Sequence, residues 1–171
     1  MMELLASLLE RAMAMALLGS ALVAGIFFAF SNFIMQALAR LEPRAGIAAM
    51  QSINVTVLNR GFLGLFVGTA LVAMLVALDA ALRFRGVSSW LAVAGGLTYV
   101  VGTFMVTGLG NVPLNQRLAE FGADDSGTES RDAQDFWRHY LKRWTFLNSV
   151  RTVAATCAAI LFLAAAILRA A

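Results

Sequence analysis

The chain has 171 residues, of which 60% are apolar and only 13% are charged. Because a soluble domain carries about 25% charged residues, this composition excludes a conventional soluble globule and a disordered chain. The net charge of +3 is typical of basic loops beside apolar segments and does not indicate a nucleic-acid partner. A single cysteine, Cys157, excludes an internal disulfide framework. The composition therefore predicts an integral membrane protein.

Charged residues bracket four long uncharged stretches, of 28, 18, 31 and 17 residues. No stretch shows the alternation of a membrane β-strand. Since a helix needs about 20 apolar residues to cross the hydrocarbon core, we expect an all-α, four-transmembrane-helix bundle, with spans at about 12–38, 57–82, 87–110 and 146–168. The whole chain, 1–171, is interpreted as one transmembrane domain.

The three connections between these spans differ in length. The second and third spans are joined by a tight turn at 83–86, which makes them antiparallel neighbours. The first loop, 39–56, is short, whereas the third, 111–145, holds six of the ten acidic residues and a glycine-rich turn at 122–127. After that turn, aromatic and basic residues recur at helical spacing, which predicts an amphipathic interfacial helix over about 131–144.

Polar side chains gather at one end of the predicted bundle. Because successive spans alternate in direction, the end of the first, the start of the second, the end of the third and the start of the fourth share one side. These ends carry Ser31, Asn32, Asn54, Asn59, Arg60, Thr107, Asn111, Asn115, Asn148, Arg151 and Thr152. We therefore expect a polar pocket that opens toward this side. Two alternatives are that the amides join helices by hydrogen bonds and that Arg60 and Arg151 extend to lipid headgroups.

Metal and cofactor chemistry is disfavoured by the residue inventory. Haem, copper and non-haem iron sites need histidine or histidine–carboxylate sets. The chain has one histidine, His139, and no carboxylate deep within a span. The glycines of the second and third spans predict close helix contacts rather than a phosphate loop. We therefore expect no metal and no organic cofactor.

The remaining polar groups can still perform chemistry on a suitable substrate. Guanidinium and amide donors stabilise an oxyanion in a water-poor pocket, and His139 could move a proton. The alternative for His139 is an exposed position at the membrane interface.

Five groups of residues form a recognisable set of motifs: Phe28-Ala29-Phe30-Ser31-Asn32-Phe33-Ile34-Met35, Ala49-Met50-Gln51-Ser52-Ile53-Asn54, Asn111-Val112-Pro113-Leu114-Asn115, the aromatic residues Trp137, Tyr140 and Trp144, and Asn148-Ser149-Val150-Arg151-Thr152. Together they resemble the motifs of the DUF1772, or anthrone oxygenase-like, membrane proteins. The resemblance runs over nearly the whole chain, in order. It implies four transmembrane helices and, from fungal members, oxidation of anthrones to anthraquinones by O2. The family-like positions are Asn54, Asn111, Asn115, Trp137, Tyr140, Trp144, Asn148 and Arg151.

Together, these observations favour a membrane-embedded oxygenase without a cofactor, which oxidises an anthrone-like or other hydrophobic polycyclic phenol with O2 as co-substrate. The expected catalytic residues are Arg151, Asn115, Asn148 and His139. The expected substrate-binding residues are Asn54, Asn59, Asn111, Thr107, Trp137, Tyr140, Trp144 and Asn32. The alternative is a non-enzymatic subunit or carrier that binds a quinone, lipid or hydrophobic metabolite.

The basic residues also predict an orientation. Nine of the 13 basic residues fall on the polar side. The positive-inside rule then places the pocket side in the cytoplasm and both termini outside, in a multi-pass protein of the cell membrane. The expected partners are the lipid bilayer and a hydrophobic small molecule. A homo-oligomer is left open, and no nucleic acid is expected.

Overall fold

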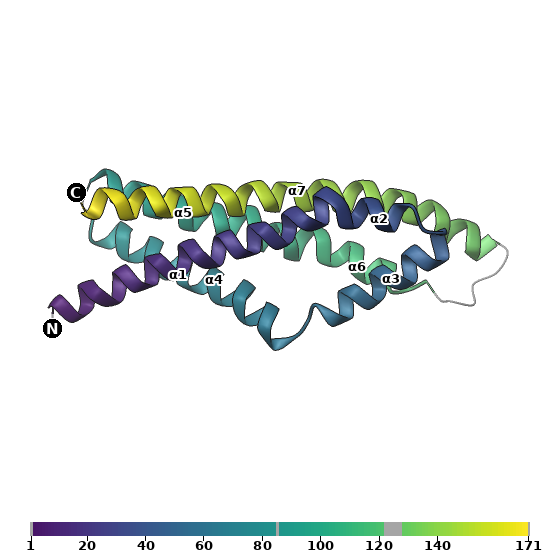
Figure 1. The fold of residues 1–171 in the computed structure, drawn as a ribbon, viewed down its shortest axis with the longest axis horizontal. Helices are drawn as coiled ribbons and strands as arrows, with labels where there is room; N and C mark the ends of the chain where they lie inside the picture. The colour runs from purple at the N-terminus through teal and green to yellow at the C-terminus, as the bar shows by residue number, and fades with distance from the viewer. Residues whose placement is uncertain (1, 85, 122–127, 171) are drawn as a thin grey trace.

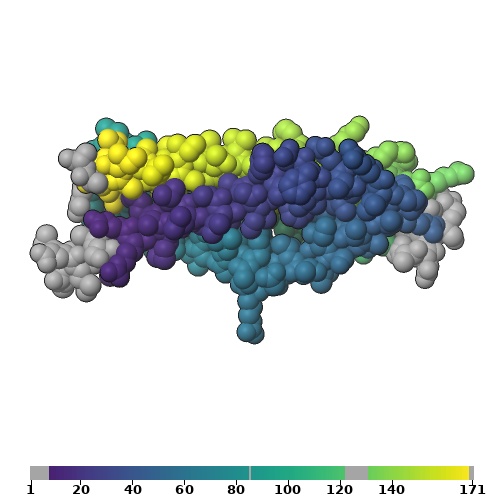
Figure 2. All heavy atoms as spheres, in the orientation of Figure 1, coloured from purple at the N-terminus to yellow at the C-terminus, as the bar shows by residue number. Residues whose placement is uncertain are grey.

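The computed structural model describes residues 2–84, 86–121 and 128–170, and within these residues the regular secondary structure is entirely helical. Four helical stretches are long and apolar enough to cross a membrane, which confirms the expected number of spans. The helices form one elongated body, with α1 and α7 side by side along it (Figures 1 and 2). The turn expected at 122–127 lies outside the described residues.

The first span is one continuous helical stretch. It consists of α1 (Met2–Ala29), the π-helix η1 (Phe30–Ile34) and α2 (Met35–Ala39). The predicted span at 12–38 lies within it. At about 1.5 Å per residue, this stretch is longer than the hydrocarbon core is thick, so part of it projects beyond the membrane.

The expected first loop is in fact mostly a helix, α3 (Pro43–Thr56). Its start follows ordinary capping rules, because the Glu42 carboxylate accepts a hydrogen bond from the Arg44 backbone N–H and Pro43 occupies the first turn. Ile47 and Met50 are buried on one side of it. The prediction of a loop at 39–56 was therefore wrong, since a short amphipathic helix can look like a moderately polar connection.

The second and third spans confirm the predicted antiparallel pair. The second is α4 (Arg60–Leu82). The third runs through α5 (Val87–Tyr99), the π-helices η2 (Val100–Met105) and η3 (Thr107–Asn111), and α6 (Val112–Leu118). It is eight residues longer than the predicted 87–110, which brings Asn115 onto a helix instead of a loop.

The fourth span is part of a single helix, α7 (Thr128–Ala170), of 43 residues. The separate helix expected over 131–144 is the first part of α7, and no break divides it from the span. Its aromatic residues Trp137, Tyr140 and Trp144 are buried against other helices. At about 1.5 Å per residue, α7 is roughly twice as long as the hydrocarbon core is thick.

The buried apolar residues form two clusters along this body. The bundle core joins α1, α4, α5 and α7 and consists of Met13, Ala16, Val23, Ala24, Phe27, Phe66, Ala70, Ala73, Val76, Ala80, Ala92, Tyr99, Ala155, Ala158, Phe162 and Ala165. The extension core joins α2, α3, α6 and the first half of α7 and consists of Met35, Leu38, Ile47, Met50, Leu118, Ala133, Trp137, Tyr140 and Trp144.

Some of the predicted glycine contacts are confirmed. A Cβ atom on Gly96 would lie 2.6 Å from the Ala73 carbonyl oxygen, and one on Gly102 would lie 2.6 Å from the Ala154 Cβ. These glycines let the third span approach its neighbours closely. The same prediction was wrong for Gly64 and Gly68, where an added Cβ would meet nothing within 4 Å.

Candidate functional site

A cavity of about 680 Å³ lies where the two cores meet. We call it the junction cavity. It lies among the α3–α4 elbow, which swings away from the rest of the bundle (Figure 1), the first and third spans and α7. The residues that line it are Ile26, Phe27, Phe30, Gln51, Asn54, Val55, Val57, Leu58, Phe62, Leu63, Phe66, Val67, Thr107, Asn111, Val112, Asn115, Gln116, Ala119, Phe121, Trp144 and Arg151.

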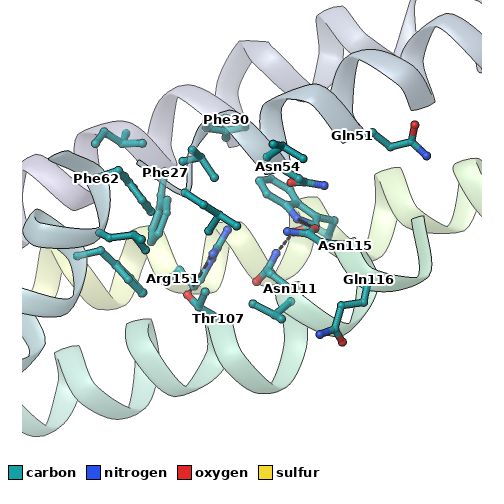
Figure 3. A pocket seen from close by; sticks show the side chains of 18 of the residues that line it. Phe27, Phe30, Gln51, Asn54, Phe62, Thr107, Asn111, Asn115, Gln116 and Arg151 are labelled. Carbon is teal, nitrogen blue, oxygen red and sulfur yellow. Dashed lines mark hydrogen bonds between the residues drawn. The ribbon is translucent and has the colours of Figure 1, made fainter. Parts of the chain in front are cut away.

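Aromatic residues and polar residues line different parts of the cavity. Figure 3 shows Phe27 and Phe62 toward one end, the two glutamines toward the other, and three asparagines in between. The aromatic end is organised by ring contacts: Phe62 stacks on Phe66, with ring centroids 5.7 Å apart and planes 6° from parallel. A cavity with an apolar wall and a few convergent polar groups is the usual form of a small-molecule site.

Arg151 is the charged group of this cavity, and only 4% of it is exposed. Its Nη1 donates a hydrogen bond to Thr107 Oγ1 over 3.1 Å, and its Nη2 donates to Asn148 Oδ1 over 2.6 Å. The guanidinium carbon lies 4.1 Å from the ring centroid of Phe27 and 5.2 Å from that of Trp144. Two aromatic faces and two hydrogen bonds therefore fix its position.

Within the described part of the chain, Arg151 has no acidic partner. No described carboxylate lines the cavity or forms an ion pair with Arg151. Its Nε–H is buried and makes no hydrogen bond. An unpaired buried charge is costly. A ligand that brings a negative charge or a strong hydrogen-bond acceptor to this point would relieve that cost.

Two further buried polar atoms at the cavity lack a hydrogen bond, namely Asn54 Nδ2 and Asn111 Oδ1. Asn111 Nδ2 donates to the Trp144 carbonyl oxygen over 3.2 Å, which fixes the orientation of that amide. Asn54 lies close to the Tyr140 hydroxyl group but makes no bond of ordinary geometry through its nitrogen. Two donors and one acceptor on residues that line the cavity are therefore buried without a hydrogen-bond partner among the described residues.

A second group of residues supports the lining from behind. Asn148 is fully buried and donates from Nδ2 to the Phe27 carbonyl oxygen and to Ser31 Oγ, each over 2.6 Å. Because its Oδ1 accepts from Arg151, Asn148 joins Arg151 to the first span. It does not line the cavity itself.

Asn115 is supported in a similar way. Its Oδ1 accepts hydrogen bonds from the Tyr140 hydroxyl over 2.8 Å and from Trp144 Nε1 over 2.9 Å. Trp137 stacks on Tyr140, with ring centroids 5.5 Å apart. Trp137 and Tyr140, predicted to bind substrate, therefore lie in the extension core and hold Asn115 and Trp144 in place.

Besides Asn148, Trp137 and Tyr140, three more predicted site residues do not line the cavity. Asn32 is exposed, and its backbone oxygen accepts a hydrogen bond from Gln36. Asn59 is exposed and caps α4, because its Oδ1 accepts from the Phe62 N–H over 3.0 Å. His139 is also exposed, beside the Phe136 ring. Each of them sits near a span end, where a topological argument cannot tell inward-facing from outward-facing positions.

The structure brings six predicted residues together at the cavity: Asn54, Thr107, Asn111, Asn115, Trp144 and Arg151. The sequence analysis missed the aromatic wall on the second span. Phe62 and Phe66 are four residues apart and therefore share a helix face, which is a signal that could have indicated them. It also gave no role to Gln51, whose Nε2 donates to the carbonyl oxygens of Leu118 and Phe121.

The helices depart from regular geometry where they approach the site. The π-helix η1 contains Ser31, and η3 contains Thr107 and Asn111. Pro113 follows η3 and cannot donate a backbone hydrogen bond, so a widened turn before it relieves the clash of its ring with the preceding turn. Short π segments within α-helices occur frequently at functional sites.

Comparison with known proteins gives the family. The family model described as anthrone oxygenase matches residues 55–161, which is more than half of the chain. The chain belongs to the anthrone oxygenase (DUF1772) family. The match includes Thr107, Asn111, Asn115, Trp144 and Arg151, and it begins one residue after Asn54. No curated protein and no solved structure gives a significant match.

Proposed function

We propose that the protein is a membrane-embedded oxygenase that oxidises an anthrone-like or other hydrophobic polycyclic phenol with O2, without a cofactor. The observation that carries the proposal is Arg151, a buried cation with an unpaired Nε–H at an aromatic cavity. The family match supports an oxygenase-like enzyme. The volume of the cavity also suits a three-ring substrate, because sites for drug-sized molecules measure about 300–1,000 Å³.

The cavity residues act by binding and by electrostatics. Loss of a proton from the methylene carbon of an anthrone converts its ketone into an enolate, whose negative charge is carried largely by oxygen. Arg151 and Asn54 line the cavity and each has a buried N–H group without a hydrogen-bond partner, and donors of this kind stabilise such an oxyanion. Phe27 and Phe62 contact the rings and keep the reacting carbon away from bulk water.

The oxidation balances without an external reductant. The electron-rich enolate gives electrons to O2, and a new carbon–oxygen bond forms at the former methylene carbon. The O–O bond then breaks as the second methylene hydrogen leaves. One oxygen atom ends in the new carbonyl group and the other in water, together with the two methylene hydrogens. Conversion of a CH2 group to C=O supplies four electrons, the number that reduces O2 to these two products.

The test is oxygen uptake by the detergent-purified, metal-analysed protein supplied with anthrone. The comparison includes Arg151→Gln, His139→Ala and a protein-free blank, because anthrones also oxidise spontaneously. We expect uptake well above the blank, one O2 per quinone formed, and no dependence on metal content. Removal of an oxyanion donor should lower the rate constant by about 10²- to 10³-fold, while His139→Ala should leave it unchanged.

Two results of this experiment would contradict the proposal. Uptake equal to the blank would contradict an oxygenase for this substrate class and would favour a binding or carrier protein. Stoichiometric iron or copper that is required for activity would contradict the cofactor-free mechanism.

A further inference from the structure

The junction cavity is open along one side of the bundle, and apolar side chains form the edges of that opening. Val55 and Leu58, at the end of α3 and beyond it, are 75% and 65% exposed, and both line the cavity. Leu63 and Val67 on α4 and Val112 on α6 line it too and are 37–38% exposed. We call these five residues the lateral opening.

The α4 part of the lateral opening, Leu63 and Val67, lies within a helix long enough to cross the hydrocarbon core, whereas Val55 and Leu58 precede Arg60 at the start of that helix. α4 has 23 residues, so it is about 34 Å long and little longer than the hydrocarbon core is thick. Leu63 and Val67 lie in its first two turns, beyond Arg60 at the interface end. With α4 across the membrane, the exposed side chains of Leu63 and Val67 face acyl chains, where they carry none of the cost that exposure to water would bring.

The end of the cavity that points away from the bundle core is tied across by hydrogen bonds. Gln51 on α3 donates from Nε2 to the Leu118 carbonyl oxygen over 2.8 Å and to the Phe121 carbonyl oxygen over 2.9 Å. These two bonds reach carbonyl groups at the end of α6 and three residues beyond it, and they join α3 to this part of the chain. Leu118 is fully buried below them. The extension core therefore lies beyond this end of the cavity.

We propose that the ligand of the junction cavity enters sideways from the bilayer, through the lateral opening between the α3–α4 elbow and α6. The ligand class is a lipid-partitioned aromatic molecule that presents its polar group first, toward Arg151. This route rests on the proposed site but not on its chemistry, because an oxygenase and a carrier would both use it. The bilayer concentrates such a molecule, and its apolar rings meet no aqueous barrier on the way.

The test is the rate at which a lipid-soluble probe enters the cavity in vesicles. The probe is 9-anthracenemethanol, which accepts excitation energy from tryptophan. Trp144 lines the cavity and reports arrival of the probe, and every protein compared carries Trp90→Phe because Trp90 is exposed on α5 and would also report probe dissolved in the lipid. Protein vesicles are mixed with probe-loaded vesicles in a stopped-flow instrument. The entry variant carries Val67→Phe and Val112→Phe, which narrow the lateral opening from both sides. The matched control carries Leu71→Phe and Leu109→Phe, which are exposed on the same two spans but do not line the cavity.

We expect the entry variant to slow association by about tenfold, the effect of a modest added barrier, with little change in the final signal. The control should associate at the wild-type rate. The rate should follow the mole fraction of probe in the lipid, and Gln51→Ala should not raise it. Wild-type kinetics in the entry variant, or a rate that rises with Gln51→Ala and with the aqueous probe concentration, would overturn the lateral route.

The outcomes also separate this inference from the proposed function. Slowed entry in a protein without oxygen uptake would contradict the oxygenase and support the route. Oxygen uptake together with unslowed entry would support the oxygenase and overturn the route. Absence of saturable energy transfer in the wild-type protein would contradict both.

Discussion

The bundle core and the extension core are packed in different ways. More than half of the described residues of the bundle core are alanine. Helices there pack closely through small residues, as where Gly96 on α5 lies against Ala73 on α4. The extension core instead stacks Trp137, Tyr140 and Trp144 along one face of α7. Small residues allow helix backbones to approach closely, whereas aromatic residues hold them apart and bring polar atoms that need partners.

The difference explains why the cavity lies at the junction. The cavity lies where the narrow packing gives way to the wide packing, beside the α3–α4 elbow, which bends away from the other helices (Figure 1). The polar groups on the two sides are satisfied differently. The amide oxygen of Asn115 receives two hydrogen bonds from the extension core, whereas Arg151 is left with an unused N–H. The extension side therefore supports the amide of Asn115, while the bundle side carries a cation with an unused N–H group.

The largest expected loss of stability comes from a substitution that disrupts the close helix packing of the bundle core. Gly96→Ala places a methyl group 2.6 Å from the Ala73 carbonyl oxygen, a backbone atom that cannot move without shifting α4. We expect the free energy of unfolding in mixed micelles to fall by about 3 kcal/mol, the upper range for overpacking. Gly68→Ala, which meets no atom within 4 Å, is the matched control and should change stability little. Equal effects of the two changes would contradict the close contact.

A smaller effect is expected on the aromatic side. Asn115→Ala removes the acceptor of two donors, Tyr140 Oη and Trp144 Nε1. Leaving a buried donor unpaired costs about 1–3 kcal/mol, so we expect a loss of about 2 kcal/mol in the free energy of unfolding and a red shift of tryptophan emission. Gln116→Ala, at the exposed neighbouring position, serves as control. An unchanged emission spectrum would show that Asn115 does not hold Trp144.

The smallest expected loss of stability comes from Asn59→Ala, which tests whether Asn59 caps a helix or binds the ligand. Asn59→Ala removes the cap of α4, which costs about 1 kcal/mol. Because Asn59 does not line the cavity, the dissociation constant of a bound ligand should stay at the wild-type value. A weakened ligand affinity at unchanged stability would contradict the capping role and would show that Asn59 contributes to ligand binding.

The sequence predicted the spans well because their signal is collective: long uncharged stretches leave few alternatives in a membrane. It also indicated which span ends face each other, and so placed Asn111, Asn115 and Arg151 in one region. The sequence did not predict which individual side chains near the span ends face the cavity. Asn59 and Asn54 are five residues apart with the same side chain, yet one caps a helix and the other lines the cavity.

The helix α3 and the continuity of α7 were missed for a related reason. Short amphipathic segments have weak periodicity, and their burial depends on partners far along the chain, such as Leu118 for Gln51. The π-helices, which set the register of Ser31 and Thr107, leave no mark in a pattern that assumes regular helical spacing.

The central claim is that Arg151 is an unsatisfied cation that anchors the ligand. Its most direct test is equilibrium binding of two fluorescent three-ring probes, anthracene-9-carboxylate and neutral 9-anthracenemethanol, to wild-type protein and to Arg151→Gln. We predict that the wild-type protein prefers the carboxylate by about tenfold to a hundredfold, since a charge-assisted hydrogen bond contributes about 1.5–3 kcal/mol, and that Arg151→Gln abolishes this preference while still binding the neutral probe. Equal affinities of the wild-type protein for the two probes, or a preference that survives in Arg151→Gln, would contradict the account.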